Sequence, residues 1–148
     1  MRVSFESALD FARQKKGWIR KTLDRIEQMH TRQRPLLPLT SHLDKTQAKE
    51  VLVARLTELA KKHGFHFNRV YVRNQKTRWG SCSHKGDISL NMKIMVLSED
   101  MRDYVLLHEL VHTKVYNHSP RFWAELNKYV PNAKAKDAHL RWYDLRLL

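Results

Sequence analysis

The chain has 148 residues, 28 Lys and Arg against 15 Asp and Glu, and one cysteine. This length suits a single domain with its own core, and no apolar run approaches the roughly 20 residues that span a bilayer, so we expect no membrane partner. The single cysteine and the lack of a secretory signal favour a cytoplasmic location. The net charge of +13 favours acidic or phosphate-rich partners, although no nucleic-acid-binding motif accompanies it.

The N-terminal region is predicted to be helical. Apolar residues in the first 30 positions recur at three- or four-residue steps, which indicates one or two amphipathic helices. Pro35 and Pro38 then mark a linker, because proline removes a backbone donor and biases its predecessor to extended backbone. We therefore predict a helical segment over residues 1–35, either an arm or part of the domain, and the main domain over residues 36–148.

Helical periodicity predicts four helices after this linker. The first covers residues 45–63 and ends at Gly64, which sits where a left-handed C-cap belongs. The others are residues 99–116, capped by Ser98, a helix that begins at Ser119-Pro120, and residues 134–147.

Residues 68–91 carry the strand signals. Side chains alternate between apolar and polar over residues 68–74, and residues 76–83 and 87–91 continue this pattern. The pair Lys85-Gly86 supplies a turn between the last two segments. We expect a small antiparallel sheet.

The helix at residues 99–116 contains a His-Glu-x-x-His pattern. His108 and His112 lie one turn apart on one face, about 6 Å along the axis, so both imidazoles can hold one metal ion. Glu109 is rotated by about 100° from His108, which places its carboxylate beside the metal as a general base rather than as a ligand. The apolar neighbours make this helix buried, and burying these groups without a metal would be costly. We predict one zinc ion per chain.

His118 is the predicted third ligand. A catalytic zinc takes three protein ligands and keeps one position open, and His118 reaches the site if the helix stops near Tyr116 and the chain doubles back. Asn117 tolerates the left-handed backbone that such a turn can use. The spacing equals that of the metzincins, but Val115 replaces their glycine and no Met-turn follows. Glu125 on the next helix is the alternative third ligand.

Two residues are candidates for contacts with the substrate or the transition state. Arg78 can bind a carboxylate or phosphate with two hydrogen bonds, and a structural ion pair is the alternative. Tyr116 can donate to an oxyanion, and simple packing is the alternative. Side chains expected only to pack around the site are Trp79, Cys82, Phe122 and Trp123.

Four segments together resemble the YgjP-like metallopeptidase family. They are residues 78–83, 88–91, 108–112 and 117–123. The resemblance covers roughly residues 45–145 and implies an α+β, zincin-like fold related to the SprT-like proteases, with a short sheet packed on the metal helix. It also implies His108, His112 and His118 as zinc ligands and Glu109 as general base.

Three functions remain open. The first is a zinc-dependent hydrolase of metallopeptidase type acting on a peptide or protein. The second keeps the metal but acts as a nucleotide pyrophosphatase on UTP-like nucleoside triphosphates, an activity attributed to a similar protein and suited to the basic surface. The third is a non-enzymatic, zinc-stabilised nucleic-acid-binding adaptor, which would bind in a salt-dependent way.

Overall fold

The computed structural model describes residues 20–21 and 43–148 apart from residue 147. The predicted N-terminal segment, residues 1–35, lies outside the described residues except for Arg20 and Lys21, so the two-part division stays a prediction. No helix in the described part is long and apolar enough to cross a membrane. The elements are α2 (Lys45–His63), β1 (Val70–Arg73), β2 (Gly80–Cys82), β3 (Ile88–Asn91), the 3-10 helix η2 (Met92–Val96), α3 (Glu99–His112), α4 (Pro120–Asn127) and α5 (Ala133–Leu140).

The sheet is mixed, which corrects the antiparallel sheet predicted above. Its strand order is β1-β3-β2, with β1 parallel and β2 antiparallel to β3. The chain leaves β1, passes through an irregular loop at residues 74–79, and places β3 between the two earlier strands. The predicted strand at residues 76–83 therefore shortens to three residues. The hairpin turn is as expected, with Gly86 at φ 78°.

Buried Asn91 explains why residues 74–79 form a loop rather than a strand. Its side-chain amide donates to the carbonyls of Gln75 and Arg78 at 2.9 and 2.8 Å, and its side-chain oxygen accepts from the backbone of Lys93 at 3.2 Å. These bonds satisfy backbone groups that a sheet ladder would otherwise take. The loop is thereby held in one shape at the end of β3.

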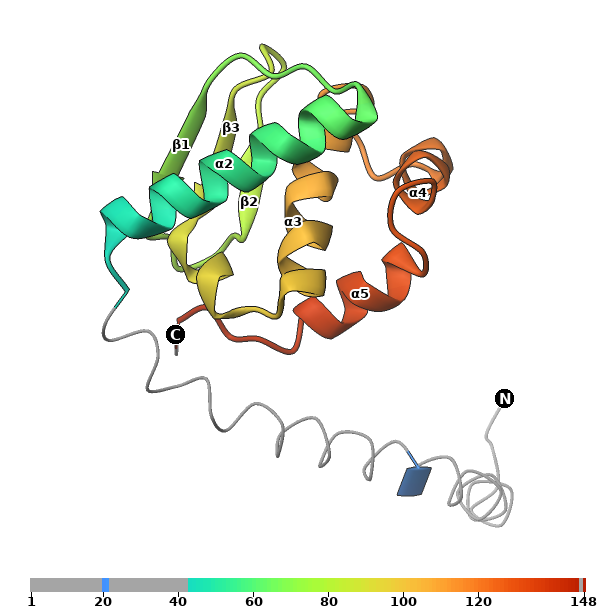
Figure 1. Cartoon of the computed structure of the whole chain (residues 1–148). Helices are drawn as coiled ribbons and strands as arrows, with labels where there is room; N and C mark the ends of the chain where they lie inside the picture. The colour runs from blue at the N-terminus through green and yellow to red at the C-terminus, as the bar shows by residue number, and fades with distance from the viewer. Residues whose placement is uncertain (1–19, 22–42, 147) are drawn as a thin grey trace, which may run out of the picture. The chain divides into compact units, whose positions relative to one another are not determined.

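Helices α2 and α3 are joined by charge as well as by packing. Arg55 donates two hydrogen bonds to Asp103, at 2.8 and 2.6 Å, in the paired geometry that suits a guanidinium and a carboxylate. Helix α2 has the predicted bounds, and Gly64 caps it with φ 69°. Figure 1 shows α2 crossing the strands, while α3 lies beside β2.

Helix α3 lies at the centre of the core. It packs against α2, β2, α4 and α5. This many-sided burial explains its almost continuous apolar sequence, because a helix covered on several sides has no wide polar face. Fully buried core side chains include Leu52, Leu56, Ile88, Leu90, Leu106, Leu110, Phe122 and Leu126.

Two helices end earlier than predicted. Helix α3 stops at His112 rather than near Tyr116, and Thr113 closes it with its backbone and hydroxyl on the carbonyl of Leu110. Helix α5 stops at Leu140, since buried Leu145 draws the following residues back to the core. Both early ends shape the site described next.

Candidate metal centre

Three histidine side chains converge at the C-terminal end of α3. The Nε2 atoms of His108 and His112 lie 3.2 Å apart, and the Nε2 atom of His118 lies 3.0 Å from the first and 3.1 Å from the second. His108 and His112 come from successive turns of the helix, whereas His118 comes from the loop before α4. The structure thus brings together the three predicted ligands.

A tight turn after α3 returns His118 to the helix. The backbone amides of Lys114 and Val115 both donate to the carbonyl of Val111, at 2.9 Å each, so the chain turns at once. The turn does not use the left-handed backbone that Asn117 would tolerate, because Asn132 is the only non-glycine residue with positive φ in the described part of the chain. The early end of α3 makes that conformation unnecessary.

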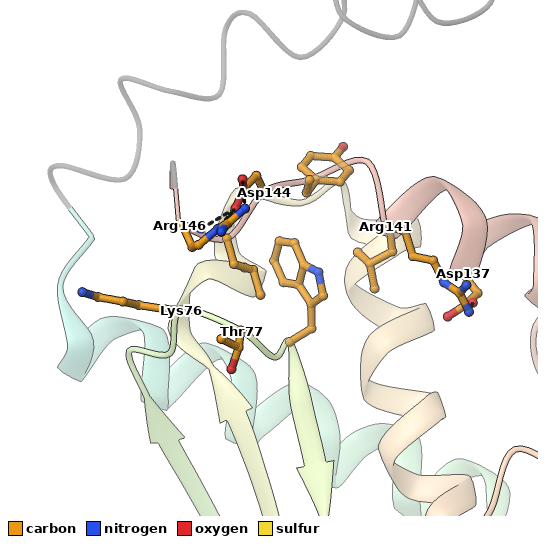
Figure 2. Close-up of a pocket in the computed structure, with 10 residues that line it drawn as sticks. Lys76, Thr77, Asp137, Arg141, Asp144 and Arg146 are labelled. Carbon is orange, nitrogen blue, oxygen red and sulfur yellow. Dashed lines mark hydrogen bonds and ion pairs between the residues drawn. The ribbon is translucent and has the colours of Figure 1, made fainter. Parts of the chain in front are cut away.

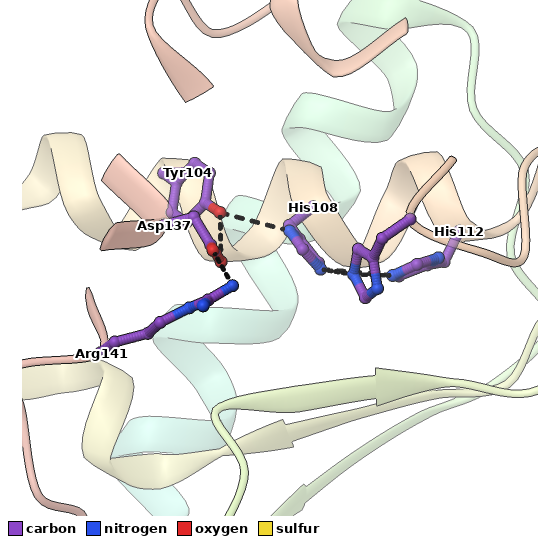
Figure 3. A network of polar contacts seen from close by, with 6 residues as sticks. Tyr104, His108, His112, Asp137 and Arg141 are labelled. Carbon is purple, nitrogen blue, oxygen red and sulfur yellow. Dashed lines mark hydrogen bonds and ion pairs between the residues drawn. The ribbon is translucent and has the colours of Figure 1, made fainter. Parts of the chain in front are cut away.

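Hydrogen bonds to the Nδ1 atoms fix the tautomer and the ring orientation of His108 and His112. His112 Nδ1 lies 3.0 Å from the carbonyl oxygen of Val115, which can only accept, so this nitrogen carries the proton. Tyr104 donates its hydroxyl proton to Asp137 at 3.3 Å, and His108 Nδ1 lies 3.4 Å from the same hydroxyl. His108 therefore donates from Nδ1 as well (Figure 3).

The positions of these protons indicate whether the three histidines suit a metal ion. With both Nδ1 atoms protonated, the Nε2 atoms of His108 and His112 point lone pairs at each other across 3.2 Å, which is repulsive unless a cation lies between them. A zinc ion bound at about 2.0–2.1 Å in tetrahedral geometry needs nitrogens at about this separation. Burial lowers the pKa of His108 to about 3, with further lowering from His112 and His118, so its imidazole is held neutral, the form that binds metal.

Glu109 is a buried carboxyl group facing the same cavity. Its side chain is 5% exposed, and its Oε2 atom has no hydrogen-bond partner within the described residues. Burial raises the pKa of Glu109 to about 8. An uncompensated buried carboxylate is costly, so this orphaned oxygen is a second feature that fits a nearby cation and a bound water.

Gly80 provides the space that Glu109 occupies. A Cβ atom at position 80 would lie 2.6 Å from Oε1 and 2.8 Å from Cγ of Glu109. No side chain larger than hydrogen fits there without moving the carboxyl group. The lack of a side chain at this position of β2 therefore lets the carboxyl group of Glu109 pack directly against the strand.

Aromatic rings close the site on the side of α4. The Phe122 ring is fully buried and stacks on His112, with centroids 4.5 Å apart, and it also contacts His108 and His118 at 4.9 and 4.8 Å. Trp123 lies 6.0 Å from His118. These rings exclude water behind the ligands, as the sequence predicted for them.

Of the two predicted substrate-contact residues, Arg78 lies at the metal cavity and Tyr116 does not. Arg78 lines a cavity of about 330 Å³ together with His108, Glu109 and His118. Tyr116 does not line this cavity; it is 54% exposed and its ring lies 4.5 Å from that of His84.

Glu125 and Cys82 are both used elsewhere in the fold. The carboxylate of Glu125 accepts from Lys128 and Tyr129, at 2.5 and 2.9 Å, and only the three histidines converge as a possible metal-binding group in the described part of the chain. Cys82 lies half-buried in β2, where burial raises the pKa of its thiol to about 11, so the thiol stays protonated near neutral pH.

The roles of four residues around the site escaped the sequence analysis. Tyr104 precedes His108 by one turn, a spacing that was available in the sequence. Gly80 and Asp137 act through contacts with residues 29 and 33 positions away respectively, and no local pattern indicates such contacts. Arg141 completes this group by donating to Asp137 at 2.6 Å.

A known protein family matches most of the chain. Residues 36–143 match the family described as YgjP-like, metallopeptidase domain. The chain belongs to this family. Its members are metallopeptidases by description, so a metal-dependent hydrolase that acts on peptides or proteins is supported, and a metal cofactor is implied.

Solved structures agree with this assignment. Abylysin from Pyrococcus abyssi, solved as a metallopeptidase zymogen, is 29% identical, with a TM-score of 0.54 over 62% of this chain and 92% of that chain. The jannalysin zymogen from Methanocaldococcus jannaschii is 24% identical, with a TM-score of 0.50 over the same shares, and supports the fold alone. The fold is thus α+β and zincin-like, as predicted. A search of curated proteins finds no match.

Proposed function

We propose that the protein is a zinc-dependent peptidase in which His108, His112 and His118 hold one zinc ion and Glu109 is the general base. The observation that carries this proposal is the convergence of three Nε2 atoms within 3.2 Å of one another, in a cavity also lined by a buried carboxyl group. Three histidine nitrogen donors with one open side are the ligand set of a catalytic zinc site.

When bound, zinc supplies Lewis acidity, which polarises a carbonyl oxygen and lowers the pKa of water from 15.7 to about 7. Glu109 would take a proton from the water as the water oxygen adds to the peptide carbonyl carbon, and would deliver it to the amine nitrogen as the C–N bond breaks. Its tight seat against Gly80 holds the carboxylate in one position for both transfers. Phe122 keeps bulk water away from the rear of the histidines.

Tyr104 and Asp137 have a supporting role in this mechanism. Asp137 accepts a hydrogen bond from the hydroxyl of Tyr104, so the hydroxyl oxygen can accept a hydrogen bond from Nδ1 of His108. This chain of bonds keeps the Nε2 lone pair of His108 directed at the metal position, as outer partners of metal-bound histidines commonly do.

A peptide or protein is the favoured substrate, because the family description and the abylysin structure both concern metallopeptidases. Neither comparison supports the UTP pyrophosphatase or the nucleic-acid adaptor. The proposal places the enzyme in the cytoplasm, a location that suits a chain whose single cysteine makes no internal disulfide.

The test compares the wild type with Glu109→Gln, both loaded with zinc and incubated with casein and, separately, with UTP. Since a general base contributes about 10²–10⁴-fold, the variant should keep one zinc per chain and lose at least 100-fold of the casein cleavage. Full turnover by the variant would contradict the proposed role of Glu109. Pyrophosphate release from UTP, without peptide release, would favour the nucleotide reaction instead.

A further inference from the structure

A second cavity lies next to the metal cavity and shares a wall with it. The two have Trp79, Leu140, Arg141 and Asp137 in common, and the second has a volume of about 430 Å³. A ligand at the metal centre can therefore continue past Trp79 into the second cavity without leaving the surface. An extended peptide advances about 3.3 Å per residue, so residues that follow one another beside a scissile bond can extend from the metal cavity into the adjoining one.

Both sides of the second cavity are fixed by long-range bonds. On one side, Asn91 holds the loop that carries Lys76 and Thr77. On the other side, the buried amine of Lys93 donates to the carbonyl oxygen of Leu145 at 2.5 Å and holds the segment after α5. The cavity is thus preformed, which lowers the entropic cost of binding.

The floor and the rim of the second cavity differ in chemistry. Apolar and aromatic side chains form much of its lining, and the rings of Trp79 and Tyr143 meet edge to face at 5.8 Å. Figure 2 shows polar side chains around it, with Lys76 on one side and Arg141 on the other.

The charged side chains of this lining leave a positive excess. Each acid is already paired with an arginine: Asp137 accepts from Arg141 at 2.6 Å, and Asp144 accepts from Arg146 at 2.9 Å. Lys76 has no such partner among the described residues. Only one terminal nitrogen of Arg141 is used in its pair, so its other N–H groups remain for a ligand.

From this arrangement we propose that the second cavity is a specificity subsite for the peptide segment beside the scissile bond. The subsite takes a large apolar side chain over Trp79 and a carboxylate at Lys76 and Arg141. This inference rests on the proposed peptidase function. The alternative occupant is the phosphate chain of a nucleotide, which the experiment tests by competition with UTP.

The experiment uses the zinc-loaded full-length protein and fluorogenic peptides of one frame. One position holds Phe or Ala, its neighbour holds Glu, Gln or Lys, and each peptide is made as a free acid and as an amide. We expect kcat/KM to be roughly five- to tenfold higher for Phe-Glu than for Phe-Lys, given the modest contribution of exposed ion pairs, and to fall by roughly tenfold when Ala replaces Phe. A preference that needs the free acid would identify the terminal carboxylate as the group bound, and one that survives amidation would identify the side chain.

Lys76→Glu supplies the decisive variant and Lys85→Glu its matched control. Lys85→Glu changes the charge by the same amount. Lys85 lies in the β2–β3 turn, at the opposite end of the hairpin, and does not line the second cavity. Lys76→Glu should abolish or reverse the preference for Glu over Lys, and Lys85→Glu should retain it. Equal behaviour of the two variants, or UTP competition that is weakened by Lys76→Glu alone, would overturn the proposal.

Binding of the same peptides to zinc-loaded Glu109→Gln, measured by calorimetry, separates this inference from the proposed function. Selective binding of Phe-Glu that depends on Lys76 would support the subsite even if the wild type cleaves none of the peptides. Cleavage by the wild type without any selectivity would overturn the subsite and leave the peptidase function standing.

Discussion

The metal cavity has two walls that are built in different ways. The helical wall, α3 with the turn to His118, places its chemical groups by local geometry, since His108 and His112 are one helical turn apart. The opposite wall, which includes Arg78, Trp79 and Gly80 before and in β2, is shaped by bonds between residues far apart in the chain, such as that of Asn91 to the carbonyl of Arg78. The first wall sets how water is activated, and the second sets what can lie beside that water.

This difference means that changes in the helical wall should remove metal or chemistry, and changes in the opposite wall should alter position and choice of substrate.

The largest effect is expected for His118→Ala, because it removes one of three nitrogen ligands. Zinc affinity, measured by competition with a chelating dye, should fall by more than the roughly 10–100-fold typical of an outer partner. His66→Ala, which changes an exposed histidine beside a different cavity, is the control and should bind zinc as the wild type does. If His118→Ala kept the wild-type affinity, the third ligand would have to be another group.

Gly80→Ala should distinguish most clearly between an effect on catalysis and an effect on zinc binding. The new methyl group would lie 2.6 Å from Oε1 of Glu109, so the carboxylate must move, and a displacement of about 1 Å can cost about 100-fold in rate. We expect this loss in peptide cleavage with zinc affinity unchanged, because the three atoms nearest to the new methyl group all belong to Glu109 and none to a histidine ligand. Activity within twofold of the wild type would show that the position of Glu109 is not critical.

Asp137→Ala should weaken the metal site indirectly. Without its acceptor, the Tyr104 proton is free to bond to Nδ1 of His108, which allows the proton of His108 to move to Nε2. Zinc affinity should fall by roughly tenfold, at the lower end of outer-partner effects, and ¹⁵N NMR of the metal-free protein should report the altered tautomer. Asp144→Ala, which breaks an ion pair with Arg146 instead, should change neither measurement.

The last prediction concerns stability and pH in the metal-free protein rather than metal binding or activity. The folded pKa of Glu109, about 8, lies above its ordinary value of 4.5, so the folded state holds this proton where the unfolded state has lost it. Stability from this group is fully present below pH 4.5 and is lost as pH rises towards 8. Against Glu109→Gln in EDTA, the wild type should lose up to about 1.4 kcal/mol per pH unit over that range, measured by urea unfolding. Parallel curves for the two proteins would contradict the burial of this carboxyl group.

The sequence predicted the helical wall well because its information is local. The spacing of the three histidines placed them together, although the turn between them uses an early helix end at His112 rather than a left-handed Asn117. The opposite wall was not predictable in the same way. Gly80 and Asp137 act on residues that are near only in the fold, and the parallel pairing of β1 with β3 depends on Asn91 holding the loop between strands.

X-ray absorption spectroscopy of the zinc-loaded full-length wild type tests the central claim most directly, since it reports the atoms bound to the metal. The predicted spectrum has three imidazole nitrogens and one further light ligand at about 2.0–2.1 Å, with one zinc per chain. Two imidazoles with a protein carboxylate, or a sulfur at about 2.3 Å, would contradict the site built from His108, His112 and His118.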